Sequence, residues 1–224
     1  MCGTLRRVIV MQPVLEIRSP DGFDLWPVSE TEAASFLPLS GGLSPAEVGT
    51  AVMRIVSCND IDPDDDPANS RPPRPADPLG SFLHGLLTFD NLFAAGGLRI
   101  TDTTTGTVFL PGCCDGLEDW RDWHRFVERG GLLGFGHEPV SPVAECIGDT
   151  VRLTVNAEQS DSPVIELPVA ELRSLLAGAE HDLAGFLALA ADWARWRLPN
   201  HQAPVAAALA RVLDLPAPAG SPEQ

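Results

Sequence analysis

The chain has 224 residues, a length that suits one domain or one domain with a long insertion. Hydrophobic residues make up 44% of it, enough to form a buried core, so global disorder is excluded. The formal net charge is −16, from 31 acidic residues and 15 arginines, and lysine is absent. The negative excess runs along the whole chain and leaves no basic surface of the kind that nucleic acids and anionic membranes require.

Long apolar segments are absent from the sequence. The apolar run at 8–11 is shorter than the roughly 7–15 residues of a signal-peptide core. No stretch approaches the roughly 20 apolar residues of a membrane span. We therefore expect a cytoplasmic protein, in which the five cysteines would be mainly thiols rather than disulfides.

The first part of the chain is predicted to hold strands and a capped helix. Residues 8–11 and 14–18 are rich in β-branched side chains and are predicted as two strands, broken by Pro13 because proline lacks a backbone donor. A helix is predicted after Ser44, which can cap its first turn, while Glu47 completes a capping box.

Segment 60–78 is rich in proline and aspartate and is expected to be a surface loop or a linker. Proline removes backbone donors and neighbouring aspartates repel one another, so neither a helix nor a central strand fits. It separates the N-terminal strands and helix, 1–59, from a main α+β region, 79–215. A flexible tail, 216–224, follows, and we expect one compact domain overall.

The main region is predicted to combine hairpins with helices. A helix is predicted to begin at Asp77, two hairpins to turn at Gly106 and Gly148, and residues 163–167 to add a strand. The remainder is predicted to be helical, ending with a short helix at 205–213. This order predicts an α+β fold: an antiparallel sheet built from hairpins, with helices on one face and a helical C-terminal part.

The most unusual segment is 109–137, where a Pro-Gly turn and two adjacent cysteines precede a predicted helix. Asp115 and Glu118 are expected to cap this helix, and Gly130 to end it. Functional groups often lie in such a strand-to-helix turn, so this segment holds the candidate chemistry of the chain.

Cysteine and histidine residues offer one class of site. Structural zinc is one alternative, although the spacing departs from the usual C-x₂₋₄-C knuckle. Its ligands would be Cys113, Cys114, His137 and Cys146. A thiol-dependent enzyme centred on the Cys113-Cys114 turn is another, in which the helix would lower a thiol pKa and the neighbouring acidic residues would raise it. We favour a third interpretation, in which these cysteines are small buried hydrophobic residues and no cofactor is bound.

The tryptophans include two pairs, Trp120 with Trp123 and Trp193 with Trp196, each three residues apart on a predicted helix. Each pair therefore lies on one side of its helix. One interpretation is an aromatic platform for a sugar or a partner protein. We favour core packing between the two helices, because amphipathic helices bury such a stripe.

The string FLPGCCDGLEDWRDW, followed by GFGHEP and later by DLAGFL, is similar to a group of actinobacterial proteins without an assigned function. The resemblance covers roughly residues 79–200. It implies no activity, cofactor or site residue for this chain. The absence of lysine and tyrosine is similar to products of GC-rich genomes, which suggests mutational bias as the origin of part of the charge pattern.

The acidic composition favours a non-enzymatic module that binds a basic protein partner. Bacterial immunity proteins, which neutralise cationic nuclease toxins, are an analogy of size, charge and α+β class. The expected contacts are Asp62, Asp64, Asp65, Asp66, Glu118, Asp119 and Asp122. Complex formation should then weaken steeply with added salt. A structural or scaffold role is the remaining alternative.

Overall fold

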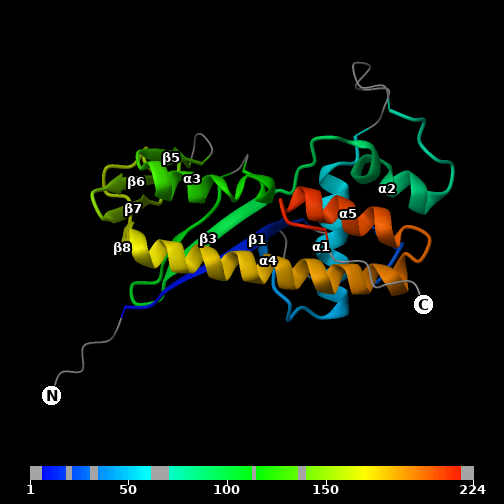
Figure 1. Cartoon of the computed structure of the whole chain (residues 1–224), viewed down its shortest axis with the longest axis horizontal. Coiled ribbons are helices and arrows are strands. Elements are labelled where there is room, and N and C mark those ends of the chain that lie inside the picture. Colours follow the sequence, from blue (N-terminus) through cyan, green and yellow to red (C-terminus); the bar gives the residue numbers. More distant parts are fainter. Residues whose placement is uncertain are drawn as a thin grey trace. The chain divides into compact units, whose positions relative to one another are not determined.

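The computed structural model describes residues 7–18, 22–30, 35–61, 71–112, 115–135 and 140–217. Within these residues it has two antiparallel four-stranded sheets and five α-helices (Figure 1). The predicted α+β class with a helical C-terminal part is confirmed, although the strands form two sheets rather than one. None of the described helices is both long enough and apolar enough to cross a bilayer.

The strands fall into two groups along the chain. The first group is β1 (Ile9–Ile17), β2 (Ser35–Pro38), β3 (Gly96–Asp102) and β4 (Thr107–Phe109), in the sheet order β2-β1-β3-β4. The second group is β5 (Leu132–Gly134), β6 (Val143–Ile147), β7 (Thr150–Thr154) and β8 (Val164–Pro168), paired in chain order. The helices are α1 (Pro45–Cys58), α2 (Pro78–Thr88), α3 (Asp122–Arg129), α4 (Val169–Arg197) and α5 (Gln202–Val212), with a short 3₁₀ helix, η2 (Leu117–Asp119).

The chain separates into two compact units, each assembled from segments that are distant in sequence. Unit 1 takes its described residues from 1–14 and 95–182, and unit 2 from 15–94 and 183–224. Strand β1 and helix α4 contribute residues to both units. The sequence divisions at 1–59, 60–78 and 79–215 remain predictions.

The predicted hairpins of unit 1 are confirmed. Their turns lie at Gly106 and Gly148, with φ of 73° and 61°, a left-handed conformation that glycine adopts without steric cost. The strand predicted at 163–167 is β8. Buried and exposed residues alternate along β7 and β8, so the second sheet has one apolar face. That face consists of Ala144, Val151, Leu153, Ile165 and Leu167.

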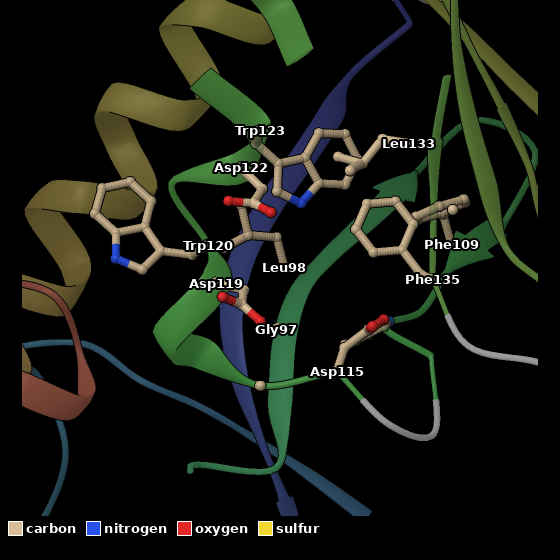
Figure 2. Close-up of a pocket in the computed structure, with 13 residues that line it drawn as sticks. Gly97, Leu98, Phe109, Asp115, Asp119, Trp120, Asp122, Trp123, Leu133 and Phe135 are labelled. Atoms are coloured by element: carbon tan, nitrogen blue, oxygen red, sulfur yellow. The ribbon is translucent and has the colours of Figure 1, made fainter. Parts of the chain in front are cut away.

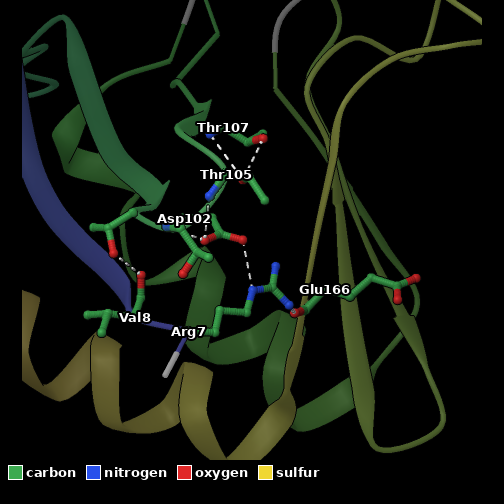
Figure 3. Close-up of polar contacts among 8 residues, drawn as sticks. Arg7, Val8, Asp102, Thr105, Thr107 and Glu166 are labelled. Atoms are coloured by element: carbon green, nitrogen blue, oxygen red, sulfur yellow. Dashed lines mark hydrogen bonds and ion pairs between the residues drawn. The ribbon is translucent and has the colours of Figure 1, made fainter. Parts of the chain in front are cut away.

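A buried carboxylate, Asp102, joins three segments of unit 1. It accepts hydrogen bonds from the backbone N–H groups of Thr104 at 2.9 Å and Thr105 at 3.3 Å. It also pairs with Arg7 Nε at 2.8 Å, and the Arg7 guanidinium donates to the carbonyl of Glu166 at 2.5 Å (Figure 3). One arginine thereby ties the chain before β1 to the β3–β4 turn and to β8.

Protonation of Asp102 should destabilise the fold. Burial alone would raise the pKa of this carboxyl, but the hydrogen bonds from Thr104, Arg7 and Thr105 and the charge of Arg7 outweigh it, so the pKa lies below its ordinary value. A carboxyl with a lowered folded pKa stabilises above its unfolded pKa, and this stabilisation is lost as the pH falls through the folded pKa. Wild type should therefore lose thermal stability below about pH 4.

The variant Asp102→Asn isolates this contribution. It should have a lower Tm than wild type at pH 7, and the difference should shrink as the pH falls below about 4. Thermal melts of both proteins across this range provide the measurement. A Tm difference that stays constant into strong acid would show that Asp102 does not act through its charge.

The predicted helix starts in unit 2 are confirmed. The Ser44 hydroxyl accepts from the Glu47 N–H at 3.3 Å, and the Glu47 carboxylate accepts from the Ser44 N–H at 2.7 Å, which completes the capping box of α1. Asp77 caps α2 by accepting from the Gly80 N–H at 2.7 Å. The buried face of α1 includes Val48, Ala51, Val52, Ile55 and Val56.

Two glycines allow very close backbone contacts in unit 2. A Cβ on Gly49 of α1 would lie 2.4 Å from the carbonyl oxygen of Pro27. A Cβ on Gly85 of α2 would lie 1.7 Å from the carbonyl oxygen of Asn59. Both distances are far inside van der Waals contact, so these helices approach their neighbours only because the side chain is absent.

Asn59, immediately after α1, is a buried polar residue whose side chain makes three hydrogen bonds. It is 3% exposed. Its amide nitrogen donates to the carbonyls of Ile55 and Phe93, both at 2.8 Å, and its oxygen accepts from the Phe93 N–H at 3.0 Å. The side chain therefore fixes the segment before β3 to the end of α1.

One sequence prediction about strands is wrong. Strand β1 continues through Pro13 without a break, because the fixed φ of proline is compatible with an extended chain and only one donor is lost. Gly96 and Gly97 begin β3. A Cβ on Gly97, where φ is 151°, would lie 2.8 Å from the Cβ of Pro111, so the close approach of this backbone requires glycine.

Candidate functional site

Unit 1 contains a pocket of about 170 Å³, formed by β3, β4, the turn that follows β4, η2, α3 and β5 (Figure 2). A single water needs only about 10–15 Å³, so the pocket can receive a group of a ligand. Two chemically different sets of side chains line it. The aromatic wall is Phe109, Trp123 and Phe135, and the acidic wall is Asp115, Asp119 and Asp122.

The aromatic wall is a packed cluster. The rings of Trp123 and Phe135 stack with centroids 5.0 Å apart and planes 20° apart. The Phe109 ring meets them edge-on, at 6.1 Å from Trp123 and 5.7 Å from Phe135. Phe109 is fully buried and Trp123 nearly so, whereas Phe135 is half-buried. The wall is therefore held in place by the core, with part of one ring accessible.

Trp123 also supplies a polar donor to the pocket. The residue is only 3% exposed, and the part that remains accessible includes the indole N–H, which has no acceptor among the described residues. Figure 2 shows the indole nitrogen on the side of the ring that faces the pocket. This N–H is therefore available as a donor to a ligand that carries an acceptor.

The acidic wall carries more charge than its surroundings neutralise. Asp122 pairs with Arg125, one turn along α3, whereas Asp119 has no basic partner among the described residues. Burial raises the pKa of Asp115; the hydrogen bond from the Gly112 N–H, at 2.6 Å, opposes this, and the negative charge of Asp119 adds to it. A cation entering the pocket would relieve this repulsion.

The described carboxylates do not by themselves make up a metal-binding group. Among the described residues, no three His, Cys, Asp or Glu side chains lie close enough together to hold a metal ion. Metal ions need ligands at about 2.0–2.6 Å. An organic cation, by contrast, is held by carboxylates on one side and by aromatic rings on the other. The pocket is therefore suited to an organic cation.

The turn before η2 differs from its prediction. Asp115 does not cap a helix: its carboxylate accepts from the Gly112 N–H, and its own N–H donates to the Gly112 carbonyl at 3.3 Å. Gly116 is extended and forms a β-bridge with Ala95, so a helix cannot start before it. The helical segment is divided into η2 and α3, neither with a side-chain cap. Its predicted end at Gly130 is confirmed by a φ of 69°.

Three of the four proposed cysteine and histidine ligands lie outside the described residues: Cys113, Cys114 and His137. Cys146 lies on β6, with its Sγ 4.0 Å from the carbonyl oxygen of Phe126. Burial raises the pKa of the Cys146 thiol, which disfavours the thiolate that metal binding and nucleophilic attack require. Zinc and thiol catalysis remain predictions.

Two of the predicted partner contacts, Asp119 and Asp122, line the pocket. Glu118 lies beside them, with its carboxylate against Gly116. The remaining predicted contacts lie outside the described residues: Asp62, Asp64, Asp65 and Asp66.

Sequence reasoning missed the aromatic wall. Phe109 and Phe135 stand at the two sides of the unusual segment, and no local pattern signals that their rings meet Trp123. Asp115 was assigned to a helix cap and its place in the acidic wall was also missed. The spacing of the aspartates at 115, 119 and 122, which brings three carboxylates close together along the chain, is the one available signal.

The two tryptophan pairs differ in burial. Trp120 and Trp123 are 2% and 3% exposed, as expected for core packing in unit 1. In unit 2, Trp193 is buried and its ring meets Trp26 edge-on at 5.4 Å, but Trp196 is 82% exposed. The core prediction is wrong for Trp196, because a spacing of three residues rotates a side chain by about 60° around a helix and here moves it off the buried face.

Comparisons of the chain with protein-family models, curated proteins and solved structures give no match. Function is therefore argued from the chemistry of the pocket. Carboxylates and aromatic rings in one pocket suit a cation, and the indole N–H suits an acceptor close to that cation.

Proposed function

We propose that the protein is a non-enzymatic binding module that recognises a basic protein partner through the pocket of unit 1. The observation that carries this proposal is the acidic wall, Asp115, Asp119 and Asp122, in a pocket whose described lining includes no basic side chain. Opposite charge on a partner would be attracted at long range by the net charge of −16 and then held locally by these carboxylates. A cytoplasmic location is part of the same proposal.

The pocket supports binding better than covalent catalysis. Its described lining contains no serine, threonine, cysteine, lysine or histidine side chain, so it offers no nucleophile paired with a histidine or lysine base. The bound cation would instead gain from charge complementarity, as in the analogy with acidic immunity proteins. That analogy concerns charge and size, because fold class by itself does not establish function.

The double variant Asp119→Asn/Asp122→Asn tests the proposal. It removes two charges from the acidic wall while keeping side-chain size, and it spares Asp115, which closes the preceding turn. Immobilised wild type should retain a basic protein from cell lysate and release it with salt, since the Debye length falls from about 8 Å at 0.15 M to about 3 Å at 1 M salt. For the purified partner, calorimetry should give a Kd at least about tenfold higher for the variant.

The matched control is Asp149→Asn/Asp161→Asn, which removes the same net charge from two exposed residues outside the pocket lining. It should bind the partner within about twofold of wild type at 0.15 M salt. Equal losses in both variants would assign binding to net charge rather than to the pocket. Retention of partners that are not basic, or association that does not respond to salt, would overturn the proposal.

A further inference from the structure

The pocket makes two demands on its ligand at once. The acidic wall favours positive charge, whereas the Trp123 indole N–H, which opens to the pocket and has no acceptor among the described residues, favours a lone pair. A metal ion or a simple ammonium ion meets the first demand and not the second. A peptide residue with a cationic side chain meets both, because its backbone carbonyl is an acceptor close to the charged group.

The aromatic wall selects among cationic side chains. A guanidinium is planar, carries five N–H donors in a fixed arrangement and stacks on aromatic rings while it pairs with carboxylates. An ammonium is compact and strongly hydrated and uses an aromatic face less well. Carboxylates beside a half-buried ring at Phe135 therefore favour arginine over lysine.

In unit 1, an arginine of the chain itself already contacts both an aromatic ring and a carboxylate. The Arg121 guanidinium carbon lies 4.4 Å from the ring centroid of Trp120, and the same guanidinium donates to the Glu180 carboxylate at 3.2 Å. An arginine is thus held between an indole face and a carboxylate next to the pocket lining. The contact shows that such an arrangement is sterically ordinary for a tryptophan on this helical segment.

We infer that the pocket of unit 1 receives an arginine residue of the partner: its guanidinium lies between the acidic and aromatic walls, and its backbone carbonyl accepts from the Trp123 indole N–H. This inference rests on the proposed function and names the group that the basic partner presents. No bond is made or broken in this recognition.

The test follows the indole resonances of the full chain in ¹H–¹⁵N NMR spectra, with the Trp123 signal assigned through Trp123→Phe. The probe is Nα-acetyl-arginine amide, which carries both the guanidinium and an amide carbonyl. Its uncharged analogue, Nα-acetyl-citrulline amide, has nearly the same shape, and Nα-acetyl-lysine amide carries the same charge. The exposed Trp196 indole serves as an internal control for contacts that do not depend on the pocket.

We expect the Trp123 indole resonance to shift saturably with the arginine probe at millimolar concentration, while that of Trp196 stays in place. Binding should be at least about tenfold weaker for the citrulline probe, and for the arginine probe with Asp119→Asn, because each loses a charge-assisted contact. The lysine probe should bind more weakly than the arginine probe. Trp123→Phe, which keeps a ring and removes the donor, should weaken binding without lowering the Tm to the point of unfolding.

The inference is overturned if the arginine probe does not move the Trp123 resonance, or if the citrulline probe or the lysine probe moves it equally. These outcomes are separate from failure of the proposed function. Suppose that the NMR test fails but Asp119→Asn/Asp122→Asn binds the basic partner more weakly than wild type does. The proposed function then stands, and only the assignment of arginine is wrong. If the double variant retains the partner, the proposed function itself is wrong.

Discussion

Gly85→Ala should destabilise the protein by about 3 kcal/mol or more, or prevent it from folding. The added Cβ would lie 1.7 Å from the carbonyl oxygen and 2.7 Å from the carbonyl carbon of Asn59. Both are backbone atoms, which cannot rotate away as a flexible side chain would. Helix α2 would have to move off the segment after α1, and the buried contacts of Leu83 and Leu86 in unit 2 would be lost with it.

Gly178→Ala is the matched control, since Gly178 also lies within a helix but a Cβ there meets no atom within 4 Å. It should leave stability unchanged or raise it by up to about 1 kcal/mol, because alanine is the better helix former. Urea unfolding of both variants and wild type measures the difference. A Gly85→Ala protein as stable as Gly178→Ala would show that the close approach of α2 to Asn59 is absent in solution.

Asn59→Ala should cost about 3 kcal/mol. The substitution removes three hydrogen bonds and leaves the Phe93 N–H, the Phe93 carbonyl and the Ile55 carbonyl without this partner in a buried place. An unsatisfied buried backbone group is more costly than the net value of the bond it replaces. The free energy of unfolding should fall while the urea m-value stays the same, because the surface exposed on unfolding is unchanged.

Asn91→Ala, at an exposed position, removes the same chemical group and should change stability by no more than about 0.5 kcal/mol. If Asn59→Ala and Asn91→Ala have the same effect, the buried network around Asn59 does not stabilise the fold. Because the Asn59 carbonyl also faces Gly85, the effects of Asn59→Ala and Gly85→Ala should not be additive in the double variant.

The candidate pocket shares residues with the core, which determines how it can be probed. Phe109 and Trp123 are buried in unit 1, so truncation to alanine would cost about 3–5 kcal/mol and confuse binding with folding. Asp119 is exposed and Trp123 can be replaced by phenylalanine with the ring retained. Substitutions at these two positions therefore separate recognition from stability.

Local features of the fold could be predicted because their causes lie within a few residues. The capping box of Ser44 and Glu47, the cap at Asp77 and the turns at Gly106 and Gly148 each depend on neighbouring backbone groups or on the freedom of glycine. With these in place, the succession of hairpins and helices was enough to predict the α+β class.

Predictions failed where a distant contact outweighed a local preference. Asp115 has the residue type and spacing of a helix cap, but the bridge between Gly116 and Ala95 of another segment keeps the chain extended there. Trp196 follows the pattern of a buried stripe, yet it lies off the buried face of α4. Tertiary context decided both cases, since a side chain is buried only if something packs against it.

For the candidate site, too, one property could be predicted from the sequence and another could not: its charge could, and its geometry could not. The sequence by itself determined its charge: Asp119 and Asp122 were expected to contact a basic partner because the chain is acidic throughout and these residues lie close together. Only the tertiary structure decided that they line a pocket, that Asp115 joins them and that Phe109 and Phe135 complete the lining around Trp123. The reason is physical: charge is a property of composition, whereas a wall of stacked rings exists only once β4, α3 and the end of β5 have been brought together by strand pairing and core packing.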